Sequence, residues 1–201
     1  MPRRTLPLPP DDLRGRELPV EVVPAGESLH RIHRGEHGAI WFGPAPGRPP
    51  EFRFDAPRGE YRVCYLGATP EASFVETFLR WPARRFIAME ELAARSLATV
   101  AVLRDLRLVS LHGPALVRMG ATAEAASGDY ALSRAWALAL WEHPSAPDGI
   151  AYRCRHDDSV FAIALYDRAA AAIEPRSSTP LDRQLTLLGR LARRYGFGMS
   201  P

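Results

Sequence analysis

The chain has 201 residues with 26 basic and 23 acidic side chains, and since it contains no lysine, all 26 basic residues are arginine. This length fits one domain with extensions and allows a core that needs neither disulfides nor metals. Two cysteines exclude a disulfide framework, a net charge of +3 argues against a nucleic-acid surface, and charges interrupt every apolar run before it could span a membrane. We therefore expect a globular, cytoplasmic protein without metal and without direct contact to nucleic acid or membrane.

The first half of the chain predicts an arm followed by strands and one well-marked helix. Residues 1–27 are rich in proline, which predicts an extended arm that lies on the domain or is partly disordered. From Ser28 onward, apolar residues separated by glycines predict short strands. Residues 62–67 form a further predicted strand, and Thr69 then supplies the N-cap of a three-turn helix that ends near Arg80.

The second half mixes strands and helices without a regular repeat. We expect strands at 97–103, 106–111, 149–153 and 160–166, a charged turn at 155–158, and helices at 112–120, 129–143 and 181–195. Leucines give the last helix one apolar face. Because the elements do not alternate as βαβ units, the order favours a single α+β domain with a mixed sheet core and surrounding helices.

Glu76 is the first candidate for a chemical role. It lies in the middle of a predicted helix, and its neighbours on the same face, Ala72 and Leu79, are apolar. Two interpretations stay open. The carboxylate is either functional or forms a surface ion pair with Arg80 one turn later, which is the commoner arrangement.

Arg31 is the second candidate. In a strand it shares a face with Leu29, and a guanidinium on an inward face needs a carboxylate or a ligand phosphate as its partner. The sequence is equally compatible with a buried structural ion pair and with phosphate binding.

Cys154 is the third candidate, at the end of a predicted core strand and beside Arg155 and His156. A thiol near cations can have a lowered pKa and can take part in ligand binding. The alternative is a free cysteine that fills a gap in the core, which is the more common role. The histidines lack the spacing of a metal site.

Several short motifs together resemble the RES domain family. In chain order they are Leu29-His30-Arg31, Arg53-Phe54-Asp55, Tyr65-Leu66-Gly67, Pro70-Glu71-Ala72, Glu76-Thr77-Phe78-Leu79, and the stretch DGIAYRCRHD from Asp148 to Asp157. Their order and separations are far more specific than any single motif. The resemblance covers about residues 28–175, which leaves an arm at 1–27 and a linker with a C-terminal amphipathic helix at 176–201.

The resemblance implies a fold related to ADP-ribosyltransferases and a role as the toxin of a bacterial toxin–antitoxin pair. Members of this family consume NAD by hydrolysis or phosphorolysis, and some are described as ADP-ribosylating a protein. Their usual partner is an Xre-type helix-turn-helix antitoxin whose C-terminal part plugs the active site. NAD, phosphate and such an antitoxin are thus the expected ligands. The last helix either docks on its own domain or supports a homodimer.

Carried over to this chain, the family arginine falls on Arg31, the glutamate on Glu76, and the tyrosine eleven residues before that glutamate on Tyr65. A second arginine, from a variable loop, falls on Arg53. The family serine falls on Cys154, which is a departure, because a thiol is a much weaker hydrogen-bonding group than a hydroxyl. The resemblance thus implies catalytic roles for the first three and contacts to NAD from both arginines, Tyr65 and Cys154.

The implied chemistry is cleavage of the nicotinamide–ribose bond, which develops positive charge on the ribose as in glycoside hydrolysis. Glu76 is expected to stabilise this charge through a ribose hydroxyl, while Arg31 and Arg53 bind the pyrophosphate. Tyr65 is expected to stack on nicotinamide or to bond a ribose hydroxyl. Transfer of ADP-ribose to a protein, and a non-catalytic module with a decayed site, remain alternatives.

Overall fold

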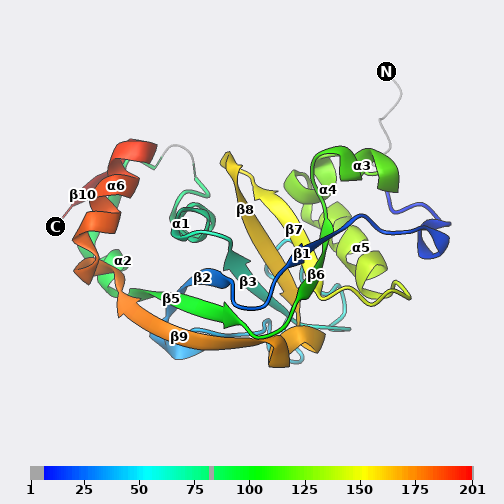
Figure 1. Ribbon diagram of the computed structural model, residues 1–201. Coiled ribbons are helices and arrows are strands. Elements are labelled where there is room, and N and C mark those ends of the chain that lie inside the picture. Colours follow the sequence, from blue (N-terminus) through cyan, green and yellow to red (C-terminus); the bar gives the residue numbers. More distant parts are fainter. Residues whose placement is uncertain (1–6, 82–83, 201) are drawn as a thin grey trace, which may run out of the picture.

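The computed structural model describes residues 7–81 and 84–200, which contain one large and one small sheet (Figure 1). The strands are β1 Val20–Val23, β2 Ser28–Arg34, β3 Val63–Gly67, β4 Phe86–Ala88, β5 Arg95–Val102, β6 Leu106–Ser110, β7 Gly149–Cys154, β8 Asp157–Tyr166, β9 Ile173–Pro180 and β10 Gly198–Ser200. Eight of them form the large sheet in the order β1-β6-β7-β8-β3-β2-β5-β9, and β4 pairs with β10. Within the large sheet β6 and β7 are parallel and all other neighbours are antiparallel.

Helices surround this mixed sheet, as the predicted α+β class requires. They are α1 Pro70–Phe78, α2 Met89–Ala93, α3 Pro114–Met119, α4 Glu124–Ser127, α5 Tyr130–Trp141 and α6 Leu185–Tyr195. Figure 1 shows α1 and α6 on one side of the β7–β8 hairpin and α3 to α5 on the other. In the part of the chain that the structure describes, no helix is both long and apolar enough to cross a bilayer.

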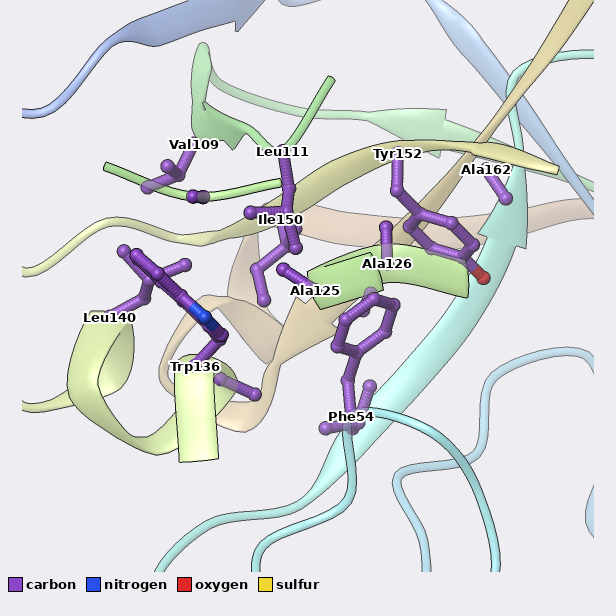
Figure 2. Close-up of a cluster of buried hydrophobic side chains, with 14 of the residues drawn as sticks. Phe54, Val109, Leu111, Ala125, Ala126, Trp136, Leu140, Ile150, Tyr152 and Ala162 are labelled. Carbon is purple, nitrogen blue, oxygen red and sulfur yellow. The ribbon is translucent and has the colours of Figure 1, made fainter. Parts of the chain in front are cut away.

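Buried side chains form three clusters, because alternate residues of a strand point to opposite faces of the sheet. The first packs α4 and α5 against β7 and β8 (Figure 2). The second lies on the opposite face of β7 and β8 and is built mainly from strand residues, among them Leu29, Cys64 and Val100. The third packs α1 and α6 together through Phe74, Phe78, Leu188 and Leu191.

Helix α1 is fixed closely to the sheet at its N-terminus. The Thr69 hydroxyl accepts a hydrogen bond from the amide of Ala72 at 3.2 Å, so the predicted N-cap is confirmed. One turn later the Ser73 hydroxyl donates to the His30 carbonyl of β2 at 2.9 Å. Gly67 makes this approach possible, because a Cβ there would lie 2.6 Å from the Ser73 amide nitrogen.

Both ends of the described chain lie against the domain. Strand β1 pairs with β6, and the Trp136 indole donates to the Pro7 carbonyl at 2.9 Å, so residues 7–27 lie on the domain. The predicted helix at 181–195 begins instead at Leu185, after a single 3₁₀ turn. Its docking on its own domain, one of the two expectations for this helix, is what the structure shows.

Three polar contacts connect α6 to α1 and to the start of β8. Arg190 pairs with Glu71 in the first turn of α1 at 2.8 Å. At the start of β8, Asp157 accepts hydrogen bonds from Arg194 at 2.9 Å and from the Tyr195 hydroxyl at 2.8 Å. We call Asp157, Arg194 and Tyr195 together the C-terminal clamp. It joins α6 to the hairpin that carries Cys154.

Candidate active site

Two adjoining cavities, of about 390 and 310 Å³, open where α1, β2, β3 and β7 meet. Both volumes lie in the range of small-molecule sites, roughly 300 to 1,000 Å³. The cavities share five lining residues, which are Phe52, Tyr65, Glu76, Arg80 and Tyr152. Of the predicted site residues, Arg31 lines the first cavity and Arg53 the second, while Glu76 and Tyr65 lie between them.

Glu76 presents its carboxylate at the junction of the two cavities. It is half-buried on α1 and forms no ion pair with any residue in the two described ranges. The nearby Arg80 instead donates to the backbone carbonyl of Glu76, and its guanidinium lies 5.2 Å from the centre of the Phe52 ring. The structure therefore does not contain the surface ion pair that was one of the two interpretations of Glu76.

Arg31 is held at the wall of the first cavity by backbone groups. Its Nη1 donates to the Gly38 carbonyl at 2.8 Å, and no carboxylate in the described part of the chain pairs with it. Burial lowers the pKa of its guanidinium, which reflects the cost of placing a cation there. A half-buried arginine without a carboxylate partner fits an anionic ligand better than a structural ion pair.

Arg53 occupies the corresponding place in the second cavity. Its Nη1 donates to the Gly128 carbonyl at 2.7 Å and to the Ser133 hydroxyl at 3.3 Å, and its guanidinium lies 4.8 Å from the Tyr130 ring centre. Burial lowers its pKa as well. Within the described residues it also lacks a carboxylate partner, so each cavity contains one half-buried arginine that is not paired with a carboxylate.

A buried carboxylate shapes the loop that presents Phe52 and Arg53. Asp55 is fully buried, and its Oδ2 accepts hydrogen bonds from the amides of Glu51 at 2.8 Å and Phe52 at 2.7 Å. Its Oδ1 accepts the Tyr65 hydroxyl at 2.9 Å. The Asp55 of the sequence motif thus sets the conformation of a binding loop without lining either cavity itself.

The hydroxyl of Tyr65 is hydrogen-bonded within the protein. The hydroxyl donates to Asp55 and accepts from the Phe54 amide at 2.9 Å, so its only proton is already used. Burial, with Asp55 adding to it, raises the pKa of Tyr65. The ring meets Phe52 edge-on at 5.5 Å. Stacking on a ligand ring stays a prediction, whereas donation to a ribose hydroxyl would require breaking the bond to Asp55.

Cys154 lies behind the cavity wall. It is 1% exposed, lines neither cavity, and places its Sγ 3.9 Å from the Ala72 carbonyl oxygen of α1. Burial and the Glu76 carboxylate raise the pKa of its thiol, so the expectation of a lowered pKa is wrong. Arg155 follows it in sequence but is exposed at the second cavity. A direct contact between Cys154 and a ligand stays a prediction.

Further residues line the two cavities. Tyr152 is buried at the junction, Arg34 and Arg95 line the first cavity, and His156 lines the second. Trp41 lines the first cavity, where its ring stacks on that of His37 with the ring centres 4.4 Å apart. The described residues hold no cluster of three or more histidine, cysteine or acidic side chains able to bind a metal. Tyr152 was detectable only as a member of the DGIAYRCRHD motif.

Comparisons with known proteins agree with one another. Residues 28–185 match the family model described as the RES domain. A protein of Sinorhizobium fredii named "Probable toxin y4kH" is 35% identical over 96 residues, which are 47% of this chain and 75% of that protein. The crystal structure of the M. tuberculosis MbcT-MbcA toxin-antitoxin complex matches with a TM-score of 0.63 and 19% identity, covering 83% of this chain and 90% of the other. At that identity the structural likeness shows the fold alone.

Proposed function

Because the chain belongs to the RES domain family, we propose that it is a toxin-type enzyme that cleaves the nicotinamide–ribose bond of NAD by hydrolysis or phosphorolysis and so depletes NAD. The carrying observation is the Glu76 carboxylate, which has no ion-pair partner in the described chain and lies between two cavities. Each cavity contains one half-buried arginine without a carboxylate partner in the described chain, Arg31 in the first and Arg53 in the second.

The charge that develops in this reaction supports a role for Glu76. In NAD the positive charge lies on the nicotinamide ring; when the bond breaks, nicotinamide leaves as a neutral molecule with the bonding electrons and the positive charge moves to the ribose. A fixed carboxylate therefore interacts more strongly with the transition state than with the substrate, which is the condition for catalysis. A carboxylate already neutralised by an arginine would lose most of this difference, so its freedom from Arg80 supports the assignment.

The surrounding groups suit the remaining parts of NAD. Arg31 and Arg53 offer guanidinium groups for charge-assisted bonds to the pyrophosphate. The rings of Tyr65, Phe52 and Trp41 line the cavities and offer faces on which a nicotinamide or adenine ring can stack.

The biological setting of the proposal comes from relatives. One is named a probable toxin and another was solved as a toxin–antitoxin complex. We extend this to the present chain as a cytoplasmic toxin whose partner is an antitoxin of the Xre type that covers the active site. An antitoxin gene beside the gene for this chain would support that assignment.

The test is an NAD-consumption assay with purified protein, with and without phosphate. We expect Glu76→Gln to lower the rate on the order of 100-fold or more, while Glu90→Gln, an exposed residue of α2 that lines neither cavity, keeps the parental rate. Nicotinamide with ADP-ribose indicates hydrolysis, ADP-ribose 1-phosphate indicates phosphorolysis, and labelled protein would indicate transfer. An unchanged rate for Glu76→Gln would remove this residue from the mechanism.

Expression in bacterial cells gives a second readout. The parental chain should stop growth and lower cellular NAD, and Glu76→Gln should relieve both effects. Toxicity that persists in Glu76→Gln would favour a binding module over an enzyme.

A further inference from the structure

The hydroxyl of one tyrosine, Tyr152, differs from those of the other buried and half-buried tyrosines. The chain has six tyrosines. Tyr130 is 38% exposed, and four of the others bond their hydroxyls to the Phe54 carbonyl, to Asp55, to the Ala137 carbonyl and to Asp157, namely Tyr61, Tyr65, Tyr166 and Tyr195. Tyr152 is only 4% exposed, yet its hydroxyl bonds to no protein group in the described ranges.

The ring of Tyr152 is rigidly placed. It belongs to β7, packs in the first core cluster, and meets the Phe54 ring edge-on at 4.8 Å. Figure 2 shows its hydroxyl oxygen pointing away from the other labelled side chains. Tyr152 and Glu76 both line the two cavities, so this tyrosine lies at the junction that also holds the Glu76 side chain.

The charges around this hydroxyl keep it a hydrogen-bond donor. Burial raises the pKa of Tyr152, and the Glu76 carboxylate and Cys154 raise it further, while Arg80 and Arg53 act in the opposite direction. The phenol therefore keeps its proton at neutral pH, and it lies within the field of the same groups that surround the proposed reaction centre.

This oxygen is not sealed in the core: among the described residues the buried side-chain polar atoms without a partner are His30 Nδ1, Trp141 Nε1 and Asp182 Oδ1, so the Tyr152 hydroxyl is open to the cavity. A ligand atom that accepts its hydrogen bond there takes the place of water. The hydroxyl of Tyr65 cannot take this role, because it already donates its hydrogen bond to Asp55.

We propose that Tyr152 is a substrate-contacting residue whose hydroxyl donates a hydrogen bond to the ribose that loses nicotinamide. It would bind one ribose hydroxyl, while Glu76 accepts a hydrogen bond from the adjacent one. The inference rests on the proposed function and names a further residue of that site. A ribose carries two adjacent hydroxyls, and an acceptor next to a donor matches such a pair. In this arrangement Tyr152 orients the ribose, while Tyr65 offers only a ring face.

The test is Tyr152→Phe, which keeps the ring and its packing on Phe54 and removes one oxygen. Because that oxygen bonds to no described protein group, we expect an unchanged thermal midpoint. Loss of a hydrogen bond to the substrate should lower kcat/KM for NAD about 10- to 100-fold, with kcat falling more than KM rises if the bond strengthens in the transition state.

The matched control is Tyr166→Phe. Its hydroxyl is fully buried, donates to the Ala137 carbonyl at 2.8 Å, and belongs to a residue that lines neither cavity. This variant should lose thermal stability and keep the parental kcat/KM. The two variants therefore have opposite expected effects on stability and on turnover.

Two results would overturn the inference while leaving the proposed function intact. One is a parental kcat/KM for Tyr152→Phe in an assay where the parental protein consumes NAD. The other is a fall in midpoint as large as that of Tyr166→Phe, since it would mean that the Tyr152 hydroxyl has a protein partner. If the parental protein itself leaves NAD intact, the proposed function fails and the role of Tyr152 fails with it.

Discussion

Replacement of Asp157 by asparagine tests the C-terminal clamp. The carboxylate of Asp157 is 13% exposed and accepts hydrogen bonds from Ser159, Arg194 and the Tyr195 hydroxyl. Although burial alone would raise it, these donors lower the pKa of Asp157 from 3.8 to about 2. A difference of this size corresponds to about 2 kcal/mol of folding stability at neutral pH.

The sign of the effect sets its pH dependence. Because the pKa is lower in the folded state, the stabilisation is fully present above the ordinary aspartate pKa and is lost as the pH falls through about 2. We expect Asp157→Asn to be about 2 kcal/mol less stable than the parent at pH 7 and about half as much at pH 3. Chemical denaturation at both pH values, followed by circular dichroism, measures this difference.

The neighbouring Asp158 provides the control. It is exposed and forms no ion pair in the described part of the chain, so Asp158→Asn should change stability by less than about 0.5 kcal/mol. If Asp157→Asn loses no more than this control, or if its loss is the same at pH 7 and pH 3, the clamp does not stabilise the fold as argued.

Two further substitutions examine the packing around Glu76. Gly67→Ala should strongly reduce thermal stability and soluble yield, because the new Cβ would lie 2.6 Å from the Ser73 amide nitrogen and hydroxyl oxygen; a parental midpoint would show that α1 can move away at little cost. Cys154→Ser should fold normally and raise kcat for NAD a few-fold, because a hydroxyl is a better hydrogen-bond donor than a thiol beside Glu76. An unchanged kcat in steady-state assays would show that this position does not limit turnover.

Local signals in the sequence predicted the parts of the site that depend on local structure. Thr69 and Pro70 mark the start of α1 through cap chemistry, and this places Glu76 two turns into the helix. The order of the motifs identified the family and pointed to Arg31, Tyr65 and Glu76, which the structure brings to one cavity. Strand β9 was missed, since it is a polar, mostly exposed edge strand with proline at its end and shows no apolar alternation.

Contacts between distant segments were beyond the reach of sequence patterns. The choice between a paired and a free Glu76 depended on Arg80 turning to a backbone carbonyl and to Phe52. The raised pKa of Cys154 follows from its burial and from the Glu76 carboxylate, whereas Arg155, next to it in the sequence, is exposed at the second cavity. Likewise, the lack of a protein partner for the Tyr152 hydroxyl is known only from the three-dimensional structure, in which the hydroxyls of Tyr61, Tyr65, Tyr166 and Tyr195 are all hydrogen-bonded.

The packing of α6 on α1 has a consequence for how the protein is made. During synthesis α1 leaves the ribosome before α6. Phe74 and Phe78 of α1 therefore cannot pack against Leu188 and Leu191 until α6 has emerged. We expect α1, the helix that carries Glu76, to reach its final packing only then. The proposed active site is therefore complete only after α6 has been synthesised.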